Sequence, residues 1–192
     1  MKAWWLVVAA CVLCLAVLNT GAWAQAAAPA GGKPAYVGVA GCKACHQTDA
    51  KGAQYKKWQT QKHAKAFETL ATPAAKAVAE KAGVTGNPQE SAKCLTCHVT
   101  GFDAPKELKK ATLTTAEGVS CESCHGAGSE YKDMKVMKDH AASVAKGLNV
   151  PNEATCTKCH NKNSPTFKAF TFAEMVKKIA HPNPAKAKVQ AN

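Results

Sequence analysis

The chain has 192 residues, of which 25 are basic and 13 acidic, so its formal net charge is +12 at pH 7. Every basic residue is a lysine, which argues against nucleic-acid recognition, since such proteins rely on the planar fork of arginine. This length fits one domain. A lysine-rich surface favours docking with an acidic protein partner or an anionic surface.

The first 24 residues have the pattern of a secretory signal peptide. Lys2 supplies the positive start, residues 4–18 are an apolar run, and residues 22–24 form a small-x-small cleavage site. The run is shorter than the roughly 20 apolar residues of a membrane-spanning helix. We therefore expect a periplasmic or secreted protein, cleaved near Ala24 and not spanning the membrane.

The mature chain is expected to form one folded domain over residues 36–182. Residues 25–35 are rich in Ala, Gly and Pro and are predicted to be a flexible leader. The polar residues 183–192 are predicted to be a disordered tail.

Four helical segments are predicted inside this domain: residues 53–71, a helix that follows Thr72 and stops at Gly83, residues 129–147, and a helix from Thr171 to His181. The second helix has Thr72 as N-cap and Pro73 at its first position. In the fourth, Thr171 and Glu174 form a capping box, with Phe170 and Met175 placed for a hydrophobic staple. Residues 84–93, 99–118 and 148–155 are predicted loops, and no strand is expected.

The pentapeptide Cys-x-x-Cys-His occurs four times, at residues 42–46, 94–98, 121–125 and 156–160. Two thiols at this spacing can add to the two vinyl groups of one haem, and the adjacent imidazole then reaches the iron. A zinc site or a thioredoxin-like Cys-x-x-Cys needs no following His. We therefore expect four covalently bound haem c groups.

The predicted attachment cysteines are Cys42, Cys45, Cys94, Cys97, Cys121, Cys124, Cys156 and Cys159. The other two, Cys11 and Cys14, lie in the signal peptide and leave with it, so no disulfide is expected. Four macrocycles are too many for a conventional core in a chain of this length. The predicted fold is mainly α, with short helices and loops wrapped around the haems.

Four irons need eight axial ligands, but the chain has only 7 histidines. The motifs supply His46, His98, His125 and His160 as proximal ligands. The remaining three, His63, His140 and His181, are predicted distal ligands.

One axial position is therefore left open, and three outcomes compete. The fourth iron could be five-coordinate, could take a thioether from Met134, Met137 or Met175, or could take a ligand from a neighbouring molecule or the mature amino terminus. Saturated iron suits electron transfer alone, whereas an open iron can bind a small ligand.

Several strings resemble the tetrahaem cytochrome c-554 family. They are Trp58 with residues 63–66, residues 94–102, residues 118–129 with the sequence Gly-Val-Ser-Cys-Glu-Ser-Cys-His-Gly, and the ending at residues 179–182. The resemblance covers residues 40–182. It implies a mainly helical fold with haems in closely stacked pairs. It also implies an electron carrier, and the namesake of the family accepts electrons from hydroxylamine oxidoreductase.

The resemblance also implies three bis-His haems and one five-coordinate haem, the second, held by Cys94, Cys97 and His98. Carried over, His63 would serve the third haem, His140 the fourth and His181 the first. A Thr and a Phe wall the open haem in the family, and residues 166–167 or 171–172 could correspond.

The leading hypothesis is an exported carrier that relays single electrons between redox partner proteins and is not itself an enzyme. Its partners would be acidic, such as a donor like hydroxylamine oxidoreductase or a membrane quinol-linked cytochrome. One alternative is an enzyme that reduces nitric oxide or a similar molecule at the open haem. Another is a subunit of an extracellular cytochrome filament with a haem ligand crossing between chains.

Overall fold

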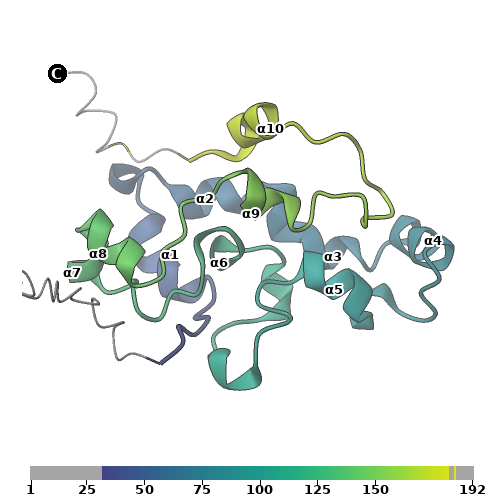
Figure 1. Cartoon of the computed structure of the whole chain (residues 1–192), viewed down its shortest axis with the longest axis horizontal. Coiled ribbons are helices and arrows are strands. Elements are labelled where there is room, and N and C mark those ends of the chain that lie inside the picture. Colours follow the sequence, from purple (N-terminus) through teal and green to yellow (C-terminus); the bar gives the residue numbers. More distant parts are fainter. Residues whose placement is uncertain (1–31, 182–183, 185–192) are drawn as a thin grey trace, which may run out of the picture. The chain divides into compact units, whose positions relative to one another are not determined.

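The structure is a computed structural model, and it describes residues 32–181 and residue 184, which belong to one compact unit beginning at Gly32. The predicted signal peptide, most of the leader and most of the tail lie outside the described residues. The described part is almost entirely helix and loop, which confirms the mainly α prediction (Figure 1). No helix in this part is long and apolar enough to cross a bilayer.

The helices are short, and 3-10 turns (η) separate several of them. Their order is α1 (Ala40–His46), η1 (Asp49–Lys51), α2 (Gln54–Gln59), η2 (Lys62–Lys65), α3 (Ala66–Thr69), α4 (Pro73–Lys81), η3 (Pro88–Glu90), α5 (Ala92–His98), η4 (Lys106–Leu108), η5 (Thr115–Glu117), α6 (Cys121–His125), α7 (Met134–Met137), α8 (His140–Ala145), α9 (Glu153–Thr157) and α10 (Phe172–Ile179).

The segment before α1 passes through the interior of the unit. Ala35, Val37 and Val39 are buried. Tyr36 forms an isolated bridge with Lys109, in which the Tyr36 amide donates to the Leu108 carbonyl at 2.7 Å. Ala35, at the end of the predicted leader, donates its amide to Ser129 Oγ at 2.9 Å and is therefore part of the fold.

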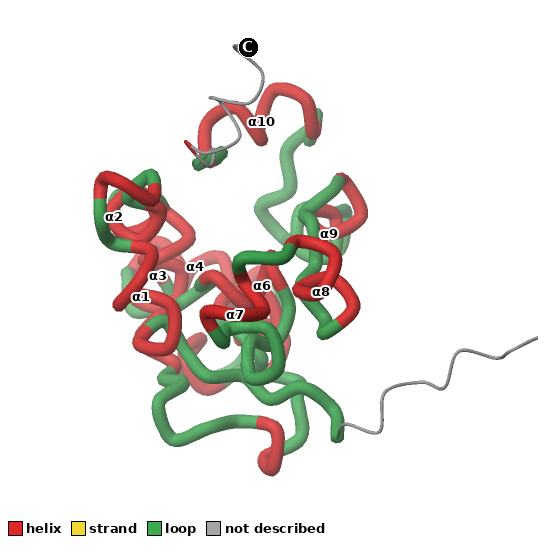
Figure 2. The backbone as a smooth tube through the Cα atoms, turned by 90° about the vertical axis from the view of Figure 1, so that its left-hand side faces the viewer, coloured by secondary structure: helices red, strands yellow, loops and turns green. Residues whose placement is uncertain are grey.

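The apolar core of the described residues is small. Leu70, Leu95 and Val99 form its buried cluster, with Phe67 and Phe102 packed against it. Helix α10, although strongly amphipathic, packs closely against no other named helix of the described chain and stands apart from the others in both views (Figures 1 and 2). A mature chain with so little side-chain core needs another apolar body to pack around, because burial of apolar surface is the main stabilising contribution to folding.

The single helix predicted over residues 53–71 is wrong, since three short elements replace it. The break falls at Thr60 and Gln61, where Gln61 is extended and Thr60 Oγ1 donates to the Lys57 carbonyl at 2.8 Å. Beyond the break, the His63 carbonyl accepts from the Val119 amide at 2.9 Å. This tertiary hydrogen bond fixes the turn that carries His63.

The helix predicted over residues 129–147 is also divided, into α7 and α8. Each new helix has its own aspartate N-cap: Asp133 accepts from the Lys135 amide at 2.8 Å and Asp139 from the Ala142 amide at 3.0 Å. A side chain that caps a new helix start competes with a continuous helix. His140 is consequently the first residue of α8.

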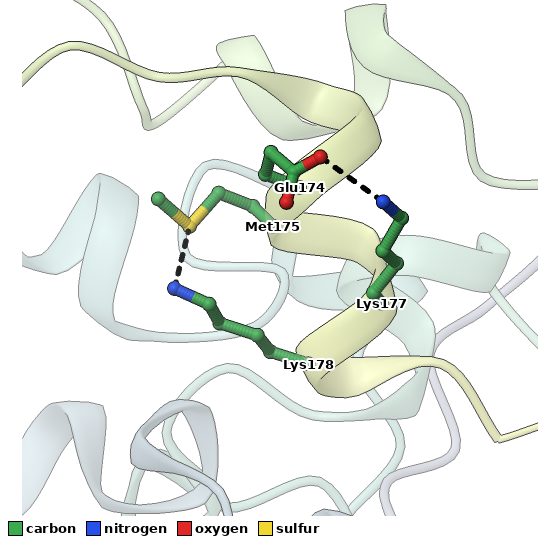
Figure 3. Close-up of polar contacts among 4 residues, drawn as sticks. All are labelled: Glu174, Met175, Lys177 and Lys178. Atoms are coloured by element: carbon green, nitrogen blue, oxygen red, sulfur yellow. Dashed lines mark hydrogen bonds and ion pairs between the residues drawn. The ribbon is translucent and has the colours of Figure 1, made fainter.

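The two remaining helix predictions have different outcomes at their caps. At α4, Thr72 Oγ1 accepts from the Ala75 amide at 3.2 Å, and Gly83 follows the helix with φ +69°, as predicted. At α10 the capping box is absent. Glu174 instead pairs with Lys177 at 3.0 Å along the exposed side of the helix, and Lys178 Nζ lies 3.7 Å from Met175 Sδ (Figure 3).

Candidate haem-binding site

Each of the four motifs lies in or directly after a short helix. Helices α1, α5 and α6 end at His46, His98 and His125, while α9 ends three residues before His160. In a helix, residues three or four apart lie on the same face. The two cysteines and the following histidine of a motif can therefore all reach one group beside the helix.

Three of the motif histidines have one ring nitrogen close to an oxygen acceptor. Nδ1 lies 2.7 Å from the Ala66 carbonyl in His98, 3.3 Å from the Asn149 carbonyl in His125, and 3.4 Å from Gln54 Oε1 in His46. An acceptor at Nδ1 fixes the proton there and leaves Nε2 as a free lone pair. Metal-bound histidines in proteins usually have this partner.

His160 is held differently. Its ring stacks on Phe170, with ring centroids 5.0 Å apart and an interplanar angle of 14°. Phe170 was predicted to cover the start of α10, so its contact with a motif histidine is a feature that sequence reasoning missed. The chain has no local signal for it, because residues 161–169 separate the two rings as an irregular segment.

Two of the three other histidines face a motif histidine. The ring centroids of His63 and His160 are 6.0 Å apart with planes at 87°, and those of His125 and His181 are 5.8 Å apart at 50°. Two imidazoles that bind one metal ion from opposite sides, each with a bond of about 2 Å, have centroids about 6 Å apart. Both pairs have this spacing.

The electrostatics of these rings favour the neutral, ligating form. Burial, and then the neighbouring His160, lower the pKa of His63. Burial also lowers the pKa of His125 and of His181, with smaller contributions from neighbouring histidines. A neutral imidazole is the form that binds metal.

Cysteines of different motifs influence one another's pKa, and most of them are half-buried. A hydrogen bond to the Cys121 thiol, and then burial, raise the pKa of Cys42. Burial and the adjacent Cys97 raise the pKa of Cys159 to about 12, and burial and then Cys156 raise the pKa of Cys124. The electrostatic influence on these thiols therefore runs between the first and third motifs, the third and fourth, and the fourth and second.

The donor set fits a macrocycle rather than a bare metal ion. No group of three or more His, Cys, Asp or Glu suited to a metal ion occurs among residues 32–181. The structure offers two imidazole pairs and leaves the other ligands to be supplied. A porphyrin would supply four nitrogens, and the thiol pairs of the motifs could attach it.

Known proteins are similar to this chain in sequence and in fold. Residues 41–126 match the family described as cytochrome c554 and c-prime. The chain is 30% identical over 141 residues to cytochrome c-554 of Nitrosomonas europaea, a match that covers 62% of this chain and 54% of the relative. The structure of reduced cytochrome c554 from the same organism matches with a TM-score of 0.55 at 26% identity, over 79% of this chain and 86% of that one.

The family match, the curated relative and the solved structure all point to the cytochrome c554 family, which this chain resembles. The chain is a multihaem c-type cytochrome with four covalently bound haems, as the four motifs predicted. The sequence match spans about half the length of the curated relative.

Among the histidines of this cytochrome, the observed contacts differ from the pairings implied by resemblance. The third haem was assigned to His63, but the structure places that ring against His160 of the fourth motif. The first was assigned to His181, whose ring lies against His125 of the third motif, although His46 of the first motif also contributes to the lowered pKa of His181, after burial and Lys57. The pairs join residues far apart in the chain, so motif spacing could not have distinguished them.

His140 is exposed at the start of α8. The chain reaches α8 after Lys132, whose Cδ would lie 3.9 Å from a Cβ added at Gly41, directly before Cys42. Tyr131, buried beside Lys132, hydrogen-bonds to the Gly126 carbonyl at 2.8 Å.

The methionines predicted as alternative ligands have other neighbours. Met134 is 64% exposed. Ser143 Oγ lies 3.9 Å from Met137 Sδ, and Lys178 Nζ lies 3.7 Å from Met175 Sδ. Thr166 and Phe167, one of the two candidate pairs for the wall of the open haem, are exposed in the segment after the fourth motif.

Proposed function

We propose that this protein is an exported tetrahaem cytochrome that carries single electrons between redox partner proteins. The observation that supports the proposal most directly is the spacing of the two imidazole pairs, 6.0 and 5.8 Å. An iron held between two imidazoles has no free position for a substrate, so its remaining chemistry is electron transfer. When bound, each haem iron supplies a one-electron couple between its ferric and ferrous states.

The contacts support roles for most of these residues. Each motif would attach one haem through its two cysteines and hold its iron through its histidine. His63 would be the second ligand at the fourth motif and His181 at the third, which leaves His140 for the first. The carbonyls of Ala66 and Asn149 orient the motif histidines that lie beside them.

The pKa shifts of the cysteines support a route through the molecule. Cys121 contributes to the raised pKa of Cys42, Cys156 to that of Cys124, and Cys97 to that of Cys159, in each case together with burial. The attachment sites therefore form a chain in the order first, third, fourth, second. The first and second haems would be the two ends, where partner proteins could exchange electrons.

The periplasm is the proposed location, because the first 24 residues read as a signal peptide and haem attachment accompanies export. The proposed partners are acidic redox proteins, for which an abundance of lysine provides electrostatic steering. A donor like hydroxylamine oxidoreductase and a membrane quinol-linked cytochrome are both compatible with this charge.

The test combines redox titration with steady-state kinetics on the purified, haem-loaded protein. A carrier should take up four electrons per chain, pass them to an oxidised acceptor cytochrome, and consume no nitric oxide catalytically when an electron donor is in excess. Sustained turnover of nitric oxide would overturn the proposal and favour the enzyme.

A second function, reduction of a small molecule, is favoured at one haem by the ligand supply. If His63, His181 and His140 serve the fourth, third and first haems, His98 is left without a second imidazole, since the sequence has no further histidine. Ferric protein should then show one high-spin haem per chain by electron paramagnetic resonance. A fully low-spin spectrum would exclude an open site.

A further inference from the structure

A buried carboxylate within the third motif has no part in attaching or ligating haem. Glu122, the residue after Cys121, is 2% exposed and is among the most completely buried side chains of the described unit. Charged side chains are almost never buried this deeply unless they are paired. Its surroundings therefore decide what it does.

Three backbone amides hold the Glu122 carboxylate. Val37 N donates to both oxygens, at 2.9 and 3.1 Å, Gly38 N donates to Oε2 at 2.8 Å, and Gly128 N donates to Oε1 at 2.7 Å. These bonds satisfy the oxygens but bring no positive charge. The two ion pairs found among the described residues involve Asp49 and Glu174 instead.

The negative charge lies within the third motif and is bound by the amides of Val37 and Gly38, shortly before the first motif. It acts on Tyr36, where burial and then Glu122 raise the pKa, and on Tyr131, where burial, Cys42 and then Glu122 raise it. It also contributes to the raised pKa of Cys42, after the hydrogen bond to Cys121 and burial. Both attachment sites are thus within reach of its field.

We propose that Glu122 is a fixed negative charge that lowers the reduction potentials of the first and third haems relative to those of the second and fourth. The inference rests on the proposed electron-carrier function. A ferric haem has one more positive charge than a ferrous haem, so a buried anion stabilises the ferric form. Its effect is large because the interior screens charge weakly, and net charge near a haem is one determinant of its potential.

This asymmetry gives the route a direction. Electrons that enter at the first motif would then pass to the fourth and second motifs, where the reduction potentials would be higher. The second haem, where His98 has no second imidazole, would then be the last acceptor on this route and the haem most often in the ferrous state. A second carboxylate, Glu117, lies close by: it accepts from the Val39 amide at 3.0 Å, and burial raises its pKa.

The test is haem-resolved redox titration of Glu122→Gln, with Glu130→Gln as the matched control. Both changes remove one negative charge, but Glu130 is exposed. We expect two of the four midpoint potentials to rise in Glu122→Gln and none to move in Glu130→Gln. Unchanged midpoints in a Glu122→Gln protein that retains four haems and wild-type helicity would overturn the proposal.

The glutamine amide would face backbone donors, so this variant could fail to fold. Redox-difference infrared spectroscopy of the wild-type protein, with and without ¹³C-labelled glutamate, covers that case. A carboxylate band sensitive to the label should shift as the two lowest-potential haems are reduced, and its absence would overturn the proposal. Failure of the carrier function would appear separately, as turnover of a small molecule with the midpoint asymmetry intact.

Discussion

At the residue scale, the pairing of His63 with His160 is the most specific prediction. Replacing His63 with Ala should remove the distal ligand of the fourth haem and leave that iron five-coordinate. The high-spin signal in electron paramagnetic resonance of the ferric protein should then rise from one haem per chain to two. Lys62→Ala, an exposed neighbour, should leave the spectrum unchanged. If His63→Ala alters the spectrum no more than Lys62→Ala does, the pairing is wrong.

The stacking of Phe170 on His160 leads to a second prediction at this scale. An aromatic pair contributes about 0.5–1.5 kcal/mol beyond its buried area. This stack also sets the plane of the His160 imidazole, whose Nδ1 has no hydrogen-bond acceptor among the described residues. Phe170→Leu should change the low-spin signal of one haem, because that signal depends on the angle between the axial ligand planes. Phe167→Leu, at a side chain 37% exposed, should leave all the signals in place.

At the scale of elements, a glycine close to the turn that carries His63 is decisive. Gly118 has φ +61°, and a Cβ there would lie 2.8 Å from the His63 carbonyl oxygen. Gly118→Ala should therefore displace η2 and reproduce the high-spin signal of His63→Ala. Gly83→Ala provides the control, because Gly83 has φ +69° but nothing within 4 Å of an added Cβ. A low-spin fourth haem in Gly118→Ala would contradict this account.

The cap of α8 gives another prediction for an element, since His140 is its first residue. Loss of an N-cap aspartate costs about 1 kcal/mol, so Asp139→Ala should lower the free energy of unfolding by that amount and loosen His140. Chemical denaturation measures the first effect and the low-spin fraction of the haems the second. Asp133→Ala, which removes the cap of α7, should give the stability loss without the spectral change.

At the scale of the whole molecule, the spatial order of the motifs predicts unequal effects of removing single haems. Replacing Cys121 and Cys124 with Ser deletes an attachment site that meets two others, whereas replacing Cys94 and Cys97 deletes one at an end. We expect the first double variant to unfold at a lower temperature and to slow electron transfer across the molecule far more. Equal effects in thermal unfolding and stopped-flow reduction would contradict the order.

The net charge leads to one more prediction at this scale. The proposed cleavage near Ala24 would remove Lys2 and lower the formal charge from +12 to +11. Eight propionates with four ferric irons would bring it to about +7, or about +3 when fully reduced. Reduction by an acidic partner protein should slow sharply as salt screens the exposed lysines. A rate independent of ionic strength between 10 and 200 mM would argue against electrostatic docking, and a small neutral reductant serves as the control.

The sequence alone determined the mainly α class, the four haems and the shortage of one imidazole, because each depends on residue identity or on a local five-residue pattern. It also located the start of α4, where Thr72 and Pro73 act within one helical turn. It did not locate the breaks at Thr60 and Asp139, because neighbouring residues favoured helix while a tertiary contact and a side-chain cap prevailed.

Only the tertiary structure decided which histidine faces which, in what order the motifs meet, and that Glu122 contacts Val37, 85 positions away. These contacts form when segments remote in the chain close together around apolar bodies that the side chains alone do not provide. Local sequence patterns do not predict which distant segments come into contact, because the free energy that selects these contacts comes from packing across the whole unit.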